Sequence, residues 1–545
     1  MCLAWQTISA GKSRLKAGVM RIRVLFFVFL SGVCGMAIEM CAARLLAPYF
    51  GTSQVVWANL IGLILLYLSL GYFLGGRLAD RYPSEFALTL LLLCAAVSMA
   101  LIPLISPPIL QRGALGVSEA SVGVLAGSLE SVLLLFFVPV TLLGMVPPFA
   151  IRLTITQLNK AGSSSGGIYM LSTLGSIVGT FLPVFWLIPS FGTRRTFLIF
   201  AALLFLSAAW SLLATQGGWM RSAEARSVRG RRFASLALQG TLALACMVPA
   251  GAALTAPLGP LKAIPQLIDE RESLYNYIQV TQSPDGTREL ILNEGQAIHS
   301  IYNPHQILYG WYWDYFLAAP FFTPGFQPSQ LHRVGIIGLA GGTIARQFTQ
   351  VYGPVPIDGV EIDPAIVDVA RQYFDMREPN LHVFEEDGRA FARQTKASYD
   401  VIAIDAFQQP YIPFHLTTVE FFQELRAHLS ENGVLTLNTG HTRTNFSLVQ
   451  AFVNTLSRVF PSVYVFLVPG TFNAEIMATK QPTSLDVFRS SLEALSPDSL
   501  LGQVAQEVLP AVSVGRPSGG VVFTDDRAPV EQLTNDLLIS YAEGR

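Results

Sequence analysis

The chain has 545 residues, a formal net charge of −1, 51% hydrophobic residues and 13% charged residues. Ordinary soluble domains carry about 25% charged residues, so this composition excludes a wholly soluble protein and indicates a membrane protein. A net charge near zero without a basic stripe excludes nucleic acid as the partner, because nothing would neutralise its phosphates. All five cysteines lie in the first half, so we expect no disulfide in the second half.

The first 256 residues are rich in apolar runs. A helix that crosses a bilayer needs about 20 apolar residues, and seven runs reach this length. They lie near 24–43, 55–75, 86–105, 128–149, 167–189, 196–214 and 234–254. We therefore expect a polytopic α-helical membrane domain over 1–256 with about seven helices. Its partner would be the lipid bilayer of the inner (plasma) membrane.

Basic residues indicate how this domain is oriented. Lys and Arg are concentrated in the N-terminal segment and in alternate loops after it, and cytoplasmic loops carry the excess of such residues. The N-terminus is therefore expected in the cytoplasm. Seven spans would place the second half of the chain on the outer face, whereas a nucleoside ligand would be made in the cytoplasm. The side on which the second half lies stays open.

A proline-rich linker is expected over 257–270, after which charged residues become frequent again. Two segments of alternating polar and apolar residues follow, ESLYNYIQV (272–280) and RELILNEGQ (288–296), separated by the turn SPDG (283–286). Two alternating runs joined by a Pro-Asp-Gly turn are typical of a β-hairpin. We expect a small β-hairpin domain over 271–330.

The residues 331–545 alternate apolar strands with helical patterns, as α/β domains do. The strand VGIIG (334–338) leads into the turn LAGGT, where Gly338, Gly341 and Gly342 let the backbone approach a ligand at the start of a helix. In the next motif, VEID (360–363), Glu361 ends a strand about twenty residues later, where a carboxylate accepts ribose hydroxyls. We expect Asp363 of the same motif to belong to this cofactor site.

Two later strands also end at acids. Asp387 and Gly388 lie in the loop EEDG (385–388), where the carboxylate can accept a hydrogen bond from an adenine amino group. Asp405 ends the strand YDVIAID (399–405) and faces the same crevice. Ligands of open α/β sheets bind outside the carboxyl ends of the strands, so these acids predict a nucleoside site. No His and Cys spacing in 270–545 predicts a metal site.

These motifs resemble the spermidine synthase (aminopropyltransferase) family in its membrane-fused form, over about residues 270–535. The resemblance implies a methyltransferase-type Rossmann domain that transfers an aminopropyl group to an amine such as putrescine. Decarboxylated S-adenosylmethionine would be the co-substrate, with no cofactor bound permanently, and a homodimer through the soluble domain is compatible with the family. By this resemblance Glu361 would hold the ribose, Asp387 the adenine, and Asp405 would deprotonate the attacking ammonium, which is no nucleophile until it loses a proton.

The chain also departs from the family pattern. Gly341 occupies the position of an aspartate that normally holds the aminopropyl ammonium, and Gln408 replaces the second aspartate of the catalytic-strand motif. The family's tyrosine is out of register, which leaves Tyr302, Tyr309 and Tyr312 as candidates, and we expect a catalytic role for Tyr309 and Tyr312. The expected substrate-binding residues are Gln296, Gln408, Asp525 and Asp526.

Three alternatives stay open at this point. Asp525 and Asp526 precede a proline, so they could cap a helix instead of reaching over the active site. A methyltransferase that uses S-adenosylmethionine itself fits the loss of the acid at Gly341, because that acid would repel the methionine carboxylate. A transporter or sensor that binds a nucleoside or polyamine without turnover fits the missing acid at Gln408.

Overall fold

The computed structural model describes residues 2–51, 54–115, 121–155, 161–219, 259–293, 295, 297–407 and 411–542. The chain forms two compact units that divide after Ala263. This point lies inside the linker expected over 257–270.

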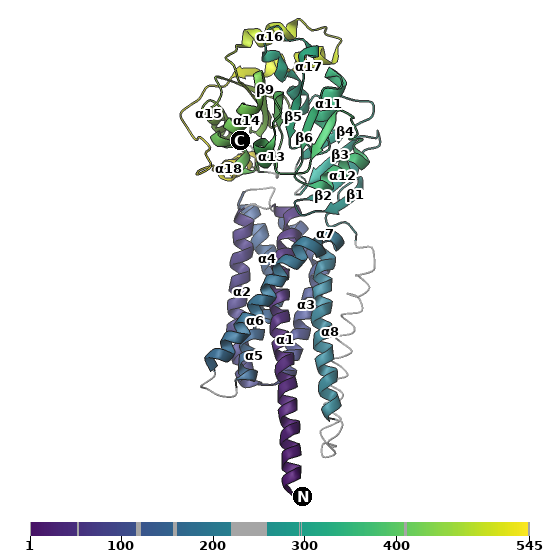
Figure 1. The fold of residues 1–545 in the computed structure, drawn as a ribbon, viewed down its shortest axis with the longest axis vertical. Helices are drawn as coiled ribbons and strands as arrows, with labels where there is room; N and C mark the ends of the chain where they lie inside the picture. Colours follow the sequence, from purple (N-terminus) through teal and green to yellow (C-terminus); the bar gives the residue numbers. More distant parts are fainter. Residues whose placement is uncertain are drawn as a thin grey trace. The chain divides into compact units, whose positions relative to one another are not determined.

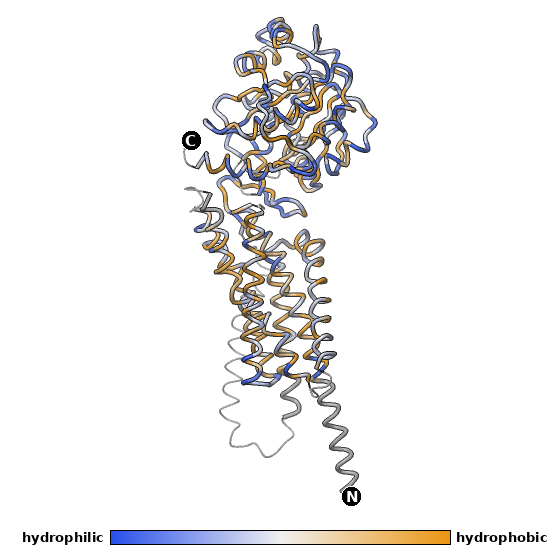
Figure 2. Tube along the Cα trace, turned by 90° about the vertical axis from the view of Figure 1, so that its left-hand side faces the viewer, coloured by the Kyte–Doolittle hydropathy of each residue, from blue (hydrophilic) through white to orange (hydrophobic). Residues whose placement is uncertain are grey.

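Among the described residues of the first unit, all the secondary-structure elements are helices (Figure 1). Its helices are α1 (Cys2–Phe50), α2 (Gln54–Arg81), α3 (Glu85–Leu115), α4 (Ser121–Gly144), α5 (Val146–Thr154), α6 (Ala161–Leu182), a π-helical turn η3 (Pro183–Leu187), α7 (Ile188–Phe191) and α8 (Thr193–Trp219). Six helical segments of the described residues are long and apolar enough to cross a membrane, and Figure 2 shows hydrophobic residues along their length. Six of the predicted apolar runs fall in them, whereas 234–254 lies outside the described residues.

Helices α1 and α6 pack backbone against backbone. A Cβ atom at Gly175 of α6 would collide with the carbonyl oxygen of Phe29 on α1, and one at Gly179 would collide with that of Val33. Small residues at such spacing permit this close approach between helices in a membrane. The packing explains why α6 carries glycines at these positions.

The second unit begins with a four-stranded antiparallel sheet in the order β1-β2-β3-β4. Its strands are β1 (Leu267–Glu272), β2 (Tyr277–Gln282), β3 (Arg288–Leu292) and β4 (Ile298–Tyr302). The expected hairpin is β2–β3, in which Ile278 pairs with Leu292. The prediction of a hairpin alone was too small, because β1 and β4 extend it on both sides. The apolar face of this sheet packs against Ile366 and Val369 of the following domain.

The larger sheet has eight strands in the order β12-β10-β11-β9-β8-β5-β6-β7. Strands β9, β8, β5, β6 and β7 are parallel, while β11, β10 and β12 join antiparallel. The strands are β5 (Val334–Ile337), β6 (Ile357–Val360), β7 (Leu381–Phe384), β8 (Tyr399–Ile404), β9 (Leu429–Gly440), β10 (Ser462–Leu467), β11 (Asn473–Thr479) and β12 (Val512–Val514).

Helices cover both faces of this sheet, which makes it a three-layer domain (Figure 1). One face packs against α10 (Tyr312–Tyr315), the 3₁₀ segment η4 (Phe316–Phe322), α11 (Thr343–Tyr352), α16 (Leu485–Glu493) and α17 (Leu500–Ala511). The other packs against α13 (Gly388–Gln394), α14 (Val419–His428), α15 (Ser447–Leu456) and α18 (Val530–Ala542). Helix α12 (Pro364–Tyr373) packs against the apolar face of the small sheet. Two short 3₁₀ helices complete the domain, η5 (Pro328–Gln330) and η6 (Phe414–Leu416).

The chain order places a topological switch point at β5. From β5 the chain moves outward through β6 and β7, and it then returns to β8 on the opposite side of β5. Loops that leave neighbouring strands in opposite directions open a crevice at the carboxyl ends, where ligands of such sheets bind. The predicted Rossmann-type α/β domain is confirmed.

Candidate active site

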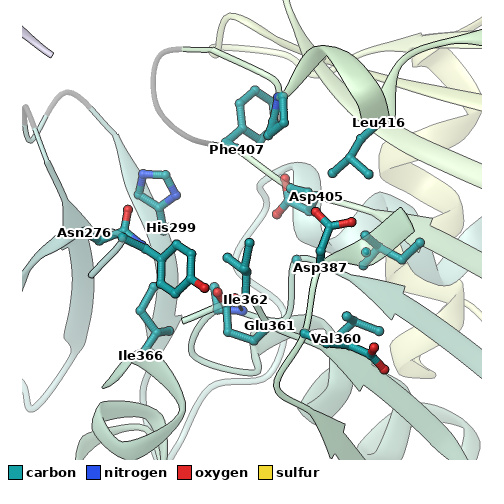
Figure 3. Close-up of a pocket in the computed structure, with 18 of the residues that line it drawn as sticks. Asn276, His299, Val360, Glu361, Ile362, Ile366, Asp387, Asp405, Phe407 and Leu416 are labelled. Atoms are coloured by element: carbon teal, nitrogen blue, oxygen red, sulfur yellow. Dashed lines mark hydrogen bonds between the residues drawn. The ribbon is translucent and has the colours of Figure 1, made fainter. Parts of the chain in front are cut away.

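A cavity lies at the carboxyl ends of β5, β6 and β8 (Figure 3). Gly338 lines it after β5, Glu361 after β6 and Asp405 after β8, while Asp387 lines it from the turn before α13. The three acids predicted from separate motifs therefore meet at one cavity. The small sheet contributes further lining residues: Tyr275 and Asn276 from the loop between β1 and β2, and His299 from β4.

Glu361 is held at the cavity wall by backbone amides. Its carboxylate accepts hydrogen bonds from the backbone N–H of Ala340, at 2.9 Å, and of Asp363, at 3.1 Å. Burial raises the pKa of Glu361 to about 7, although these amides act in the opposite direction. The carboxylate is fixed in orientation, and its remaining lone pairs can accept the two hydroxyls of a ribose.

The glycine turn between β5 and α11 serves this arrangement in two ways. Gly338 has φ +90°, and a Cβ atom there would collide with the carbonyl oxygen of Asp405, so this position needs glycine. Gly341 donates its backbone N–H to Ser300 Oγ at 2.8 Å, and a Cβ atom there would lie 2.7 Å from the Ser300 Cβ. Of the three glycines predicted in this turn, only Gly338 lines the cavity, because Gly341 faces β4 and Gly342 faces Met376.

Asp363 is a supporting residue, which corrects the expectation of a cofactor contact. One carboxylate oxygen caps α12 by accepting the N–H of Ala365 at 3.1 Å. The other accepts hydrogen bonds from Ser273 Oγ at 2.5 Å and from Asn276 Nδ2 at 2.9 Å. Asp363 is fully buried and does not line the cavity, but it fixes Asn276, which does.

Asp387 divides its two oxygens between a helix and a histidine. Oδ1 caps α13 through the N–H groups of Arg389 and Ala390, and Oδ2 lies 2.9 Å from His415 Nε2. Partial burial raises the pKa of Asp387, but the hydrogen bonds from His415 and the backbone outweigh burial and hold the pKa below its ordinary value. An adenine amino group would have to share Oδ2 with His415. Gly388 lines the cavity next to Asp387.

Asp405 lines the cavity at the carboxyl end of β8. It accepts a hydrogen bond from Asn438 Nδ2 at 2.9 Å and further hydrogen bonds from the side chains of Tyr312 and Trp313. Burial raises the pKa of Asp405 to about 6, against the lowering effect of these three donors. A carboxylate with this pKa is ionised at neutral pH and can accept a proton there.

The structure separates the two candidate tyrosines. Tyr312 contacts Asp405, as a catalytic role requires. The hydroxyl of Tyr309 instead accepts the N–H of Asn303 at 3.0 Å and donates to the carbonyl of Gln306 at 3.2 Å, so it fixes the loop after β4. Neither tyrosine lines the cavity, and Tyr309 also lacks a contact that would support its expected catalytic role.

The C-terminal acids lie elsewhere, which corrects their expected place over the substrate. Asp525 forms a two-pronged ion pair with Arg389, at 2.7 and 2.8 Å, and accepts the hydroxyl of Thr418 at 2.7 Å. Asp526 is exposed, and neither acid lines the cavity. Gln296 and Gln408 lie outside the described residues.

Several residues of the site escaped the sequence analysis. Asn276, His299 and His415 line the cavity, and the sequence offered no signal for them beyond their closeness to the quoted motifs. Glu475 is the other residue missed. It lies in β11, is fully buried, and interacts electrostatically with Asp405. Its strand, NAEIMAT, gives no hint of a site at this position.

Comparison with known proteins shows which family the chain is similar to. A family model described as "Spermine/spermidine synthase domain" matches residues 322–490. The chain is 34% identical over 281 residues to a probable polyamine aminopropyl transferase of Bifidobacterium longum, over 48% of this chain and 61% of that protein. It is 33% identical over 211 residues to a polyamine aminopropyltransferase of Vibrio vulnificus, over 37% of this chain and 68% of that protein.

Among solved structures, a probable spermidine synthase from Corynebacterium glutamicum is similar at 22% identity with a TM-score of 0.39, over 48% of this chain and 97% of that one. The spermidine synthase of Thermotoga maritima is similar at 21% identity with a TM-score of 0.37, over 45% of this chain and 84% of that one. The chain spans less than two thirds of the Bifidobacterium relative, 61% of its length.

Proposed function

The chain belongs to the polyamine aminopropyltransferase (spermidine synthase) family, and from this membership we propose that it transfers the aminopropyl group of decarboxylated S-adenosylmethionine to an amine. The observation that carries the proposal is the position of Asp405. Its buried carboxylate lies in the same cavity as Glu361 and Asp387, the two acids suited to a ribose and an adenine. A proton acceptor thus stands at the end of a nucleoside site.

In the proposed reaction the neutral amine nitrogen attacks the aminopropyl carbon that is bonded to the sulfonium. A carbon–nitrogen bond forms, the carbon–sulfur bond breaks, and its electron pair stays on sulfur to give neutral 5′-methylthioadenosine. The nitrogen must first lose a proton, and Asp405 accepts it. Tyr312 and Asn438 donate hydrogen bonds to Asp405 and hold its carboxylate in place. Glu361 and Asp387 hold the nucleoside while the bond is exchanged.

The direct test is product analysis. The full-length protein would be incubated with decarboxylated S-adenosylmethionine and putrescine, and the products identified by mass spectrometry. We expect spermidine and 5′-methylthioadenosine in equal amounts. Intact nucleoside with every amine offered would refute the proposal and favour a protein that binds without turnover.

A second candidate is a methyltransferase that uses S-adenosylmethionine itself. The observation that favours it is Gly341, where the family has an acid and where this chain has only a backbone N–H bonded to Ser300. Without that acid, nothing at this position repels the methionine carboxylate. Parallel incubations with S-adenosylmethionine decide between the two candidates, since methyl transfer yields S-adenosylhomocysteine and a methylated amine.

We further propose that the first unit anchors the enzyme in the inner (plasma) membrane as a multi-pass domain. The proposal is supported by six helical segments with mean hydropathy from 1.7 to 2.6. In water such helices would leave large apolar surfaces exposed; a bilayer removes this cost. Fractionation of cells that express the full chain should recover it with membranes, resistant to extraction by high salt or alkali but released by detergent.

A further inference from the structure

Asp405, which lines the cavity, begins a row of polar side chains on one face of the sheet; the other members of this row do not line the cavity. Asp405 follows β8, and the register of β8 with β9 brings it beside Asn438. Asn438 in turn pairs with Glu475 of β11. Partners in adjacent strands point to the same face, so Asp405, Asn438 and Glu475 form a line across three strands. Asp405 and Glu475 are two inter-strand spacings apart, about 9–10 Å between Cα atoms.

Aromatic side chains cover this row. Tyr312 and Trp313 of α10 donate hydrogen bonds to Asp405, and their ring centroids lie 4.6 Å apart. The Tyr312 hydroxyl also interacts electrostatically with Glu475. Aromatic faces and carboxylates together are the surroundings that an ammonium group prefers.

Glu475 is incompletely satisfied in this position. Its side chain is fully buried, and Oε1 accepts a hydrogen bond from Thr436 Oγ1. Its second oxygen, Oε2, is buried without a hydrogen-bond partner among the described residues. Burial raises the pKa of Glu475 well above its ordinary value, and the neighbouring Asp405 charge acts in the same direction.

Among the residues that the structure describes, no cationic side chain pairs with either of the two acids. A buried carboxylate without a partner is costly, and natural proteins retain one where a ligand or a second charge completes it. An unpaired acid beside the proposed base thus points to a cationic ligand.

We propose that Glu475 binds the second ammonium group of the acceptor, so that the acceptor is a diamine held between Asp405 and Glu475. The inference rests on the proposed aminopropyl transfer and deepens it. Asp405 takes the proton of the attacking nitrogen, and Glu475 holds the far nitrogen as a cation. This acid would stand in for the family acids that the chain lacks at Gly341 and Gln408. It also gives a physical reason for a buried glutamate in an otherwise apolar strand.

The test compares two acceptors of equal length, 1,4-diaminobutane and 1-aminobutane, on the full-length protein and on Glu475→Gln. Glutamine keeps the shape of the side chain and removes the charge. We expect kcat/KM for the diamine to fall about tenfold to a hundredfold, the range for a lost hydrogen bond to a charged group, mostly through a higher KM. The value for the monoamine should stay unchanged, so the preference for the diamine should disappear.

Glu507→Gln is the matched control. Glu507 is also an acid with a buried, unpartnered Oε2, but it lies beside Tyr315 and Asp314, away from Asp405. Its substitution should leave the preference between the two amines as it is in the wild type. Equal losses for both amines in Glu475→Gln would overturn the proposal, because they would mean a structural role. An unchanged preference would overturn it as well.

A binding measurement separates this inference from the proposed reaction. Calorimetry with each amine in the presence of 5′-methylthioadenosine needs no turnover. If the wild type forms no product but binds the diamine more tightly than Glu475→Gln does, the reaction is refuted and the subsite stands. If the two proteins bind the diamine equally, or neither binds it, the subsite is refuted.

Discussion

Replacing Asp405 with asparagine tests the proposed base, because the change removes the proton acceptor and little else. Asparagine has the same shape and can still accept the hydrogen bond that Asn438 donates at 2.9 Å. Loss of a general base lowers turnover by about 10²–10⁴-fold. The release of 5′-methylthioadenosine, followed between pH 5 and 8, would measure it. Affinity for this nucleoside should stay nearly the same, since Glu361 and Asp387 are intact.

The pH profile gives a second, independent reading. The pKa of Asp405 is about 6, and the base works only when it is ionised. The kcat/KM of the wild type should therefore fall about tenfold for each pH unit below 6. The fall of kcat/KM below pH 6 is the acid limb of the profile, and the residual activity of Asp405→Asn should lack it.

As pH rises, the contribution of Asp405 to the free energy of unfolding should fall while the activity rises. The folded pKa of Asp405, about 6, is raised from an ordinary value of 3.8, so folding favours the protonated form. The wild type therefore loses about 3 kcal/mol of stability as pH rises from about 4 to about 6. Asparagine never ionises and avoids this loss, although its amide nitrogen faces the donors of Tyr312 and Trp313, which costs about 1–3 kcal/mol. We expect a melting temperature at pH 7 no lower than that of the wild type.

The control is Asp400→Asn, the same substitution in the same strand. Asp400 accepts the N–H of His332 and the hydroxyl of Ser430, both at 2.7 Å, and does not line the cavity. This variant should lose stability and keep the acid limb. Wild-type turnover in Asp405→Asn, or an acid limb that survives in it, would refute the assignment of Asp405 as the base.

Three further predictions follow from the contacts described above. Glu361→Gln should weaken binding of 5′-methylthioadenosine about tenfold to a hundredfold, as measured by calorimetry. The control is Glu378→Gln, which changes an acid away from the cavity and should leave this affinity unchanged. Equal affinities of the wild type and Glu361→Gln would refute the ribose assignment. Asp525→Ala leaves Arg389 with a single acidic neighbour and should lower the unfolding free energy by about 1–2 kcal/mol, the upper part of the range for a partly exposed pair; an unchanged melting temperature would contradict it. A reporter fused after Pro265 should report the cytoplasm, where the proposed co-substrate is made, and an external signal would separate the enzyme from it.

The meeting of Glu361, Asp387 and Asp405 at one cavity could be predicted from the sequence, because it depends on the order of residues along the chain. Glu361 and Asp405 directly follow apolar strands, Asp387 follows another strand three residues on, and parallel strands bring their carboxyl ends to one edge. The role of Asp363 was not predictable, since its partners Ser273 and Asn276 come from the small sheet, about ninety residues earlier in the chain. Local sequence carries no record of that packing.

The surroundings of Asp405 were harder to predict, because they depend on contacts between distant parts of the chain. Glu475 lies on the same face as Asp405, two strands away, because β11 pairs antiparallel with β9 although β10 separates these two strands in the chain. The choice between Tyr309 and Tyr312 depends on one short helix, α10, which turns Tyr312 inward and leaves Tyr309 on the loop. The ion pair of Asp525 with Arg389 likewise joins residues far apart in the chain.

The glycine contacts between α1 and α6 bear on how the first unit can move. Gly175 and Gly179 bring the two backbones together with no side chain between them, so neither lipid nor water fits into the seam. Sliding one helix along the other would drive a carbonyl oxygen into the next turn of its neighbour. We therefore expect α1 and α6 to move together as one rigid body. If the first unit changes its conformation, the distances from spin labels on α2 or α3 to labels on α1 should change. The distance between labels on α1 and α6 should stay constant.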